Sequence, residues 1–138
     1  MGGMYVDGRW HTRGHLVTYA AEHAATALLE WLVHLEVMGI DDAPATIPFI
    51  EIDLPDEINR DEYTDAGLPN RWQSEKTTTQ RLGDTWLKGI NAPALFVPSV
   101  VVPARNVVLN PLHPDARKIQ VVRTFEHRLD PRLLTGLA

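Results

Sequence analysis

The sequence predicts a single α+β domain over residues 1–138. Three observations predict this class. The length suits one domain with a sizeable core, and no repeat, low-complexity tract or Gly/Ser linker divides the chain. Two segments place apolar residues at helical spacing, and several shorter segments have the apolar runs or the alternation of β-strands. We therefore expect several strands and about two helices.

The first half of the chain contains two expected strands and one expected helix. Residues 15–20 (HLVTYA) predict a short, largely buried strand, and residues 46–54 (TIPFIEIDL) alternate as a half-exposed strand does. Residues 24–37 have a helical pattern that Gly39 ends. One broad face of this helix carries its apolar residues: Ala27, Leu28, Trp31, Leu32 and Leu35.

The second half begins with residues 55–73, which are rich in Asp, Asn, Pro and Gly and are expected to form a loop. Residues 74–88 predict a second helix with Ser74 as its N-cap. Its inward face carries Leu82, Trp86 and Leu87. Three strands are expected to follow, over residues 94–102, 106–110 and 118–127. Prolines mark edges, bulges or ends of these strands, at Pro98, Pro103 and Pro111.

The composition is that of an ordinary folded protein, with 44% hydrophobic residues and a net charge of −5. No apolar run is long enough to span a membrane, and the N-terminus lacks the basic and apolar regions of a secretory signal. The absence of cysteine excludes disulfide and thiolate chemistry, so we expect a cytoplasmic protein.

Acidic and basic residues are unevenly distributed along the chain. Residues 36–65 hold ten acids and one base, whereas residues 66–138 hold ten bases and five acids. The net negative charge argues against general nucleic-acid binding. Either the acidic segment is a solvated edge, or the basic half of the chain faces an anionic ligand or an acidic partner.

Glu30 stands out because it lies in a helix that is apolar almost all round. A buried carboxylate costs several kcal/mol unless it is paired or protonated. We therefore expect Glu30 to act on a ligand or to form an ion pair with a fixed positive charge. The alternative is a surface glutamate on a narrow polar face with Glu22, His23, Thr26 and His34.

Arg9 lies in the short stretch GRWHTRG and is a natural complement to a negative charge. A guanidinium can hold a carboxylate or a diphosphate through two hydrogen bonds at once. Gly8 and Gly14 let the backbone turn tightly and approach a ligand closely. The alternative is a surface loop arginine stacked on Trp10.

Tyr19 and Ser99 are two further candidates in apolar surroundings. Tyr19 belongs either to the core or to a surface that stacks on a flat heterocycle. The Ser99 hydroxyl must hydrogen-bond either backbone or ligand. The chain has neither a P-loop nor a dinucleotide-binding glycine motif, and its six histidines lack metal-ligand spacing. Of these histidines, His11 and His113 lie in loop-like segments that can touch a ligand.

The succession GRWHTRG, YAAEHAATALLEWLVHLE and LFVPSVVVPARNVVLNPLHPD strongly resembles the RES domain, named for an arginine, a glutamate and a serine. The resemblance runs over nearly the whole chain. The matching residues are Arg9, Glu30 and Ser99, and the family's tyrosine matches Tyr19. The resemblance implies a toxin of a bacterial toxin–antitoxin pair. It also implies an ADP-ribosyltransferase-like fold, similar to diphtheria toxin and the poly-ADP-ribose polymerases.

The resemblance further implies an enzyme that consumes NAD as its substrate and uses no other cofactor. RES toxins split off nicotinamide, with water or phosphate as the acceptor, and some members modify a protein instead. This cleavage passes through an oxocarbenium-like state that a carboxylate can stabilise. The residues expected to be catalytic are Arg9, Glu30 and Ser99. Those expected to bind NAD are Arg9, Tyr19, Trp10, His11 and Asn110.

A partner is also implied, because RES toxins are encoded beside an antitoxin with an Xre-type helix-turn-helix domain. The antitoxin is expected to block the NAD pocket, to bind DNA in place of this chain, and to join it in a dimer or a larger complex. Family members usually carry a short strand before the GRW segment, which we expect to be absent from a chain that begins MGGM. Two alternatives stay open: an ADP-ribosyltransferase for a specific cellular protein, and a non-catalytic RES-like binding module.

Overall fold

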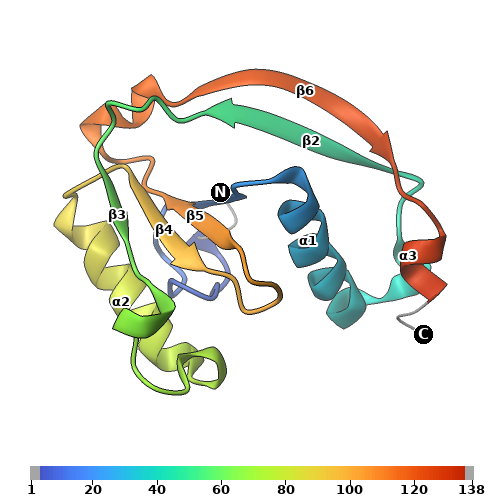
Figure 1. The fold of residues 1–138 in the computed structure, drawn as a ribbon, viewed down its shortest axis with the longest axis horizontal. Helices are drawn as coiled ribbons and strands as arrows, with labels where there is room; N and C mark the ends of the chain where they lie inside the picture. The colour runs from blue at the N-terminus through green and yellow to red at the C-terminus, as the bar shows by residue number, and fades with distance from the viewer. Residues whose placement is uncertain (1–3, 136–138) are drawn as a thin grey trace.

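The computed structural model describes residues 4–135 and has the predicted α+β class (Figure 1). One sheet contains, in spatial order, β1 (Thr18–Ala21), β5 (Arg105–Leu109), β4 (Ala94–Pro98) and β3 (Arg60–Glu62). A separate two-stranded ribbon contains β2 (Thr46–Asp53) and β6 (Gln120–Arg128). The helices are α1 (Ala24–Met38), α2 (Lys76–Gly89) and the short α3 (Arg132–Thr135). Short 3-10 turns lie at Ile40–Asp42, Asp65–Gly67, Trp72–Ser74 and Pro114–Lys118.

The four-stranded sheet supplies the main core. Its strand β5 pairs antiparallel with both β1 and β4, and β3 pairs parallel with β4. Because successive side chains of a strand alternate between faces, β4 buries residues on both sides of the sheet. Leu95 and Val97 pack with Trp86 of α2, whereas Phe96 packs with Ile52 on the opposite face. This burial on both faces explains the continuous apolar run in the β4 sequence.

The ribbon of β2 and β6 arches over the sheet and α1 (Figure 1). A second, smaller core joins α1 to this ribbon through Leu32, Ile47 and Leu129. Helix α1 ends as expected at Gly39, whose φ of 121° suits glycine and whose amide N–H donates to the Leu35 carbonyl. One face of α1 therefore packs against the ribbon, and this contact determines the direction in which the other faces of the helix point.

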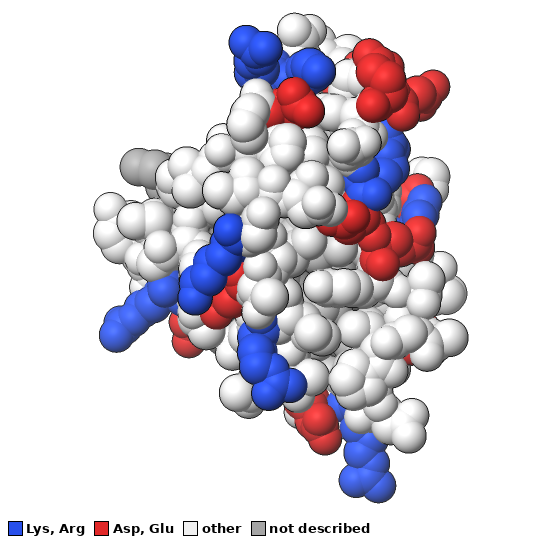
Figure 2. All heavy atoms as spheres, turned by 90° about the vertical axis from the view of Figure 1, so that its left-hand side faces the viewer, with Lys and Arg blue, Asp and Glu red and all other residues white. Residues whose placement is uncertain are grey.

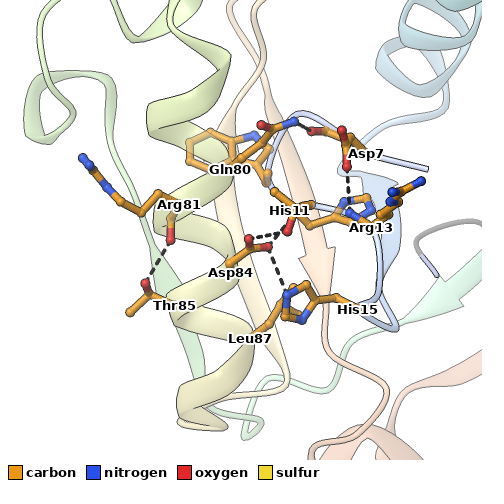
Figure 3. A network of polar contacts seen from close by, with 12 residues as sticks. Asp7, His11, Arg13, His15, Gln80, Arg81, Asp84, Thr85 and Leu87 are labelled. Carbon is orange, nitrogen blue, oxygen red and sulfur yellow. Dashed lines mark hydrogen bonds and ion pairs between the residues drawn. The ribbon is translucent and has the colours of Figure 1, made fainter. Parts of the chain in front are cut away.

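The N-terminal loop is fastened to α2 by polar contacts (Figure 3). The backbone N–H and the hydroxyl of Thr12 donate to the two carboxylate oxygens of Asp84 at 2.9 and 2.7 Å. The Gln80 amide donates to the Gly8 carbonyl at 2.9 Å. These contacts join residues more than 70 positions apart and place the GRWH segment against the helix.

Two local predictions were wrong for reasons of tertiary structure. The expected strand 15–20 is shorter and begins at Thr18, and Tyr19 is exposed because β1 lies at the edge of the sheet. The expected loop 55–73 contains β3, which forms by parallel pairing with β4 and has no apolar run of its own.

Two boundaries also differ from the prediction. Ser74 does not cap α2, because it ends a 3-10 turn in which its hydroxyl donates to the Arg71 carbonyl, and Glu75 occupies the N-cap position. The expected strand 94–102 ends at Pro98, because the chain turns at Ser99.

The surface on the α2 side of the molecule carries both signs of charge (Figure 2). Lys and Arg side chains alternate with Asp and Glu and with uncharged surface, and neither sign covers this face continuously. None of the helices within residues 4–135 has the length and apolar character that crossing a bilayer requires.

Candidate active site

A pocket of about 470 Å³ lies where five parts of the chain meet. Its volume is in the range of small-molecule sites, about 300–1,000 Å³. The N-terminal loop contributes Arg9, β1 contributes Tyr19, α1 contributes Glu30, and β5 contributes Asn106. Much of the remaining wall is apolar, with Ala20, Ala21, Ala27, Val33, Pro98, Val100 and Val101. The sequence prediction named Arg9, Tyr19 and Glu30, and the fold brings all three to this one pocket.

Glu30 is half-buried in the pocket wall and is held by two donors. The Ser99 hydroxyl donates to its Oε1 at 2.6 Å, and the Asn106 side-chain amide donates to the same oxygen at 2.8 Å. Within residues 4–35 and 41–135, its Oε2 receives no hydrogen bond. The carboxylate is thus oriented through one oxygen and keeps the other for a ligand. The alternative of a solvated surface glutamate does not fit this arrangement.

Ser99 fixes both Glu30 and the turn after β4. Besides donating to Glu30, its hydroxyl oxygen accepts the backbone N–H of Val101 at 3.0 Å and that of Val102 at 3.3 Å. A hydroxyl has one donor and two acceptor lone pairs, so these three bonds saturate it. Of the two partners expected for this hydroxyl, backbone or ligand, the structure shows the backbone, and it adds a role in orienting Glu30.

Arg9 presents an uncompensated positive charge to the pocket. Its backbone carbonyl accepts the Thr79 hydroxyl of α2 at 2.6 Å, which fixes the residue, and its guanidinium donates to the Gln73 carbonyl at 3.0 Å. No carboxylate of residues 4–35 or 41–135 lies within 4.0 Å of this guanidinium. An Arg9–Glu30 ion pair is therefore not part of the structure. The remaining N–H donors suit a carboxylate or a phosphate.

Tyr19 combines an accessible ring with a buried hydroxyl. The side chain lines the pocket and the residue is 41% exposed, whereas its oxygen accepts the backbone N–H of Trp10 at 3.1 Å. Burial raises the pKa of the Tyr19 phenol to about 12, and the charge of Asp84 adds to this increase while the Trp10 bond opposes it. The phenol therefore stays neutral, and the flat ring is what the pocket offers to a ligand.

Three residues expected to bind NAD are placed differently. Trp10 borders the pocket, but its ring is buried in the main core beside Trp72, with ring centroids 6.1 Å apart. His11 is buried behind Tyr19 and is not part of the pocket wall. The structure does not bring Asn110 to the pocket, since its buried side chain holds the Leu87 carbonyl at 3.1 Å.

Asn106 is a site residue that the sequence interpretation missed. Its donation to Glu30 fixes the orientation of the amide, and its Oδ1 is buried with no hydrogen-bond partner within the described residues. An unsatisfied buried acceptor costs about 1–3 kcal/mol, which is unusual in a purely structural position. The signal was present in the strand RNVVL, because asparagine is depleted from strands and needs a reason to occur in one.

The Glu30–Asn106 distance is maintained by a clamp just outside the pocket. Arg105 of β5 forms two hydrogen bonds with Glu22, the first residue after β1, and a further ion pair with Glu62 at 3.2 Å. Hydrogen bonding to Arg105 holds the pKa of the Glu22 carboxyl below its usual range. Because β5 carries both Arg105 and Asn106, this clamp fixes the start of α1 to the strand that orients Glu30.

Comparison with known proteins identifies the family. The RES domain family model matches residues 1–130. The chain is 40% identical to "Toxin Res" of Pseudomonas putida over 123 residues, which cover 87% of this chain and 83% of that protein. It is 34% identical to the "Prs ADP-ribosylating toxin" of a Sphingobium species over 138 residues, with 96% and 84% covered. It is 32% identical to "Toxin Res" of Yersinia enterocolitica over 132 residues, with 91% and 83% covered. The chain belongs to the RES domain family.

Proposed function

We propose that this chain is the toxin of a RES–Xre toxin–antitoxin pair and that it cleaves the nicotinamide–ribose bond of NAD. One observation carries the proposal: a carboxylate oriented through one oxygen faces the same pocket as an unpaired guanidinium and an exposed tyrosine ring. The names of the relatives, two toxins called Res and one ADP-ribosylating toxin, agree with it. An ADP-ribosyltransferase-like fold belongs to the same proposal.

Three pocket residues can each contribute a different interaction to this cleavage. The bond from the ribose C1′ to the nicotinamide nitrogen breaks, and its electron pair leaves with neutral nicotinamide. The positive charge that develops on the ribose is stabilised by the Glu30 carboxylate, whose free oxygen can also accept a ribose hydroxyl. Arg9 holds the diphosphate through its fork of N–H donors. Tyr19 stacks on the nicotinamide ring.

The acceptor completes the reaction. Water attacks C1′, loses a proton to the solvent and gives ADP-ribose. Inorganic phosphate attacks the same carbon and gives ADP-ribose that carries a phosphate on C1′. A second candidate is transfer of ADP-ribose to a protein side chain, which the name of the 34% identical relative favours. The antitoxin of the pair is proposed to be an Xre-type DNA-binding protein that covers the pocket.

Controlled expression in a bacterial host tests the toxin proposal. We expect expression to deplete cellular NAD and to stop growth, and we expect Arg9→Ala to abolish both effects. The reason is that the guanidinium has no carboxylate partner among residues 4–35 and 41–135, so its removal affects the ligand far more than the fold. Arg13→Ala, a change in an exposed residue of the same loop, is the matched control. If Arg9→Ala remained fully toxic at equal expression, the proposed site would be wrong.

Asn106→Asp tests whether the orientation and charge of Glu30 matter. The substitution replaces a donor to Glu30 with a second carboxyl group at about the same distance. Since two adjacent carboxylates resist ionising together, one of them will hold a proton at neutral pH. We expect kcat for nicotinamide release to fall roughly tenfold to a hundredfold at pH 7 and to recover partly at higher pH.

The matched control for this change is Asn59→Asp, which alters an exposed loop residue in the same way. It is expected to leave kcat and its pH dependence as in the wild type. Identical pH profiles for Asn106→Asp and the wild type would contradict the assigned role of Asn106.

A further inference from the structure

His11 makes a contact with Tyr19 that neither the core nor the pocket requires. The two ring centroids lie 5.5 Å apart, and His11 Nδ1 is 2.6 Å from the Tyr19 hydroxyl oxygen. His11 is only 2% exposed, so this contact is buried on the His11 side. We infer that His11 is a positioning residue for Tyr19, which it fixes as a flat wall for a planar heteroaromatic ring.

The hydrogen bonds of His11 define its tautomer. Its Nε2 lies 3.0 Å from the Val6 carbonyl oxygen, which can only accept, so Nε2 carries the proton. In the neutral imidazole Nδ1 then carries the lone pair and accepts the Tyr19 O–H. The tyrosine oxygen in turn accepts the Trp10 backbone N–H. The hydroxyl hydrogen is thus directed to His11 and away from any ligand.

The Gly8 backbone lies very close to both members of this pair. A Cβ built on Gly8 would lie 2.5 Å from His11 Cε1 and 2.7 Å from the Tyr19 hydroxyl oxygen. Real Cβ atoms do not approach other atoms so closely. Gly8 is therefore required for the His11–Tyr19 contact, and the loop that carries His11 is itself fastened to α2 (Figure 3).

The chemical consequence is a preference for one kind of ligand surface. Because the hydroxyl is used by His11 and Trp10, Tyr19 offers only its ring face to the pocket. That face favours a planar ring, and a positively charged one gains a further cation–π attraction. The assignment of this ring as the nicotinamide cation of NAD rests on the proposed function, whereas the fixing of Tyr19 by His11 does not.

Two substitutions separate positioning from packing. His11→Asn keeps an acceptor near the Nδ1 position for Tyr19 and loses the bond to Val6. His11→Gln keeps a donor near the Nε2 position for Val6 and removes the acceptor for Tyr19. Asparagine leaves the larger void, so packing alone makes His11→Asn the more damaging change. Positioning of Tyr19 makes His11→Gln the more damaging one.

Initial-rate kinetics with NAD provide the first measurement. We expect His11→Gln to raise KM about tenfold with little change in kcat, because a wall that contacts substrate and transition state alike is misplaced. His11→Asn should restore KM to within about threefold of the wild type. A loss of folded protein would instead lower the apparent kcat at constant KM. Lower kcat at constant KM in both variants, or a higher KM for His11→Asn than for His11→Gln, would overturn the inference.

A titration of the Tyr19 phenol tests, without NAD, whether His11 positions Tyr19. The alkaline absorbance change of a Tyr19→Phe protein is subtracted from that of each other variant, over the pH range in which circular dichroism shows the fold intact. Loss of the acceptor removes a bond that favours the neutral phenol, so His11→Gln should contain at least about tenfold more Tyr19 phenolate at a given pH. His11→Asn should follow the wild type. If the Tyr19 phenol began to ionise at the same pH in the wild type, His11→Gln and His11→Asn, the inference would be overturned. A wild type that releases no nicotinamide would overturn only the proposed function.

Discussion

Glu30→Gln is expected to lower nicotinamide release from NAD by about 10²–10³-fold while the protein stays folded. The change removes the negative charge that faces the developing ribose cation and alters little else. The glutamine carbonyl oxygen can still accept the Ser99 hydroxyl and the Asn106 amide, which now hold Glu30 at 2.6 and 2.8 Å. Because these contacts survive, the loss should appear in kcat, with a small change in the free energy of unfolding.

The matched control is Glu126→Gln, an exposed change on the ribbon strand β6 that removes the same charge. It is expected to keep the wild-type rate, which separates the effect of Glu30 from the effect of net charge. A Glu30→Gln protein that retained more than about a tenth of the wild-type rate would exclude electrostatic stabilisation by this carboxylate.

Gly83→Ala is expected to lower the free energy of unfolding by about 3 kcal/mol and Tm by roughly 10 °C. A Cβ at this position of α2 would lie 1.6 Å from the Trp10 carbonyl oxygen, a backbone atom in the loop next to Arg9. Neither the helix nor the loop can yield without breaking the contacts between them, including the bond from Thr79 to the Arg9 carbonyl. The loss is a large share of the 5–15 kcal/mol that keeps a domain folded.

Gly89→Ala in the same helix is the control, because a Cβ there meets no atom within 4 Å. Alanine has the higher helix propensity, so this variant should be as stable as the wild type or slightly more stable. Thermal unfolding followed by circular dichroism compares the two. Equal Tm values for Gly83→Ala and Gly89→Ala would contradict the close approach of α2 to the N-terminal loop.

The sequence predicted the elements whose own pattern decides their structure. The helical spacing of apolar residues located α1 and α2, and apolar runs or alternation located β2, β4, β5 and β6. It missed β3, because Arg60–Glu62 becomes a strand only through parallel pairing with β4. It placed Tyr19 in a buried strand, because no local signal tells that β1 lies at the edge of the sheet.

Three residues of the candidate site, Arg9, Tyr19 and Glu30, were named from the sequence. Arg9 and Glu30 were hard to explain by packing, and the structure places both in one pocket. Asn106 was missed because its role depends on the alignment of β5 with α1, which is a tertiary relation. Asn110 was expected at the site through its motif, but it holds a backbone carbonyl of α2 within the core.

The central claim, that this pocket cleaves NAD, is tested most directly by incubating the purified wild-type protein with NAD and measuring free nicotinamide. The assay is run in buffer, with phosphate, and with a cell extract as a source of acceptor protein, with Glu30→Gln in parallel. We expect release by the wild type in at least one condition and its loss in Glu30→Gln, and the condition that supports release identifies the acceptor. No release by the wild type in any of the three conditions, or equal release by both proteins, would contradict the claim.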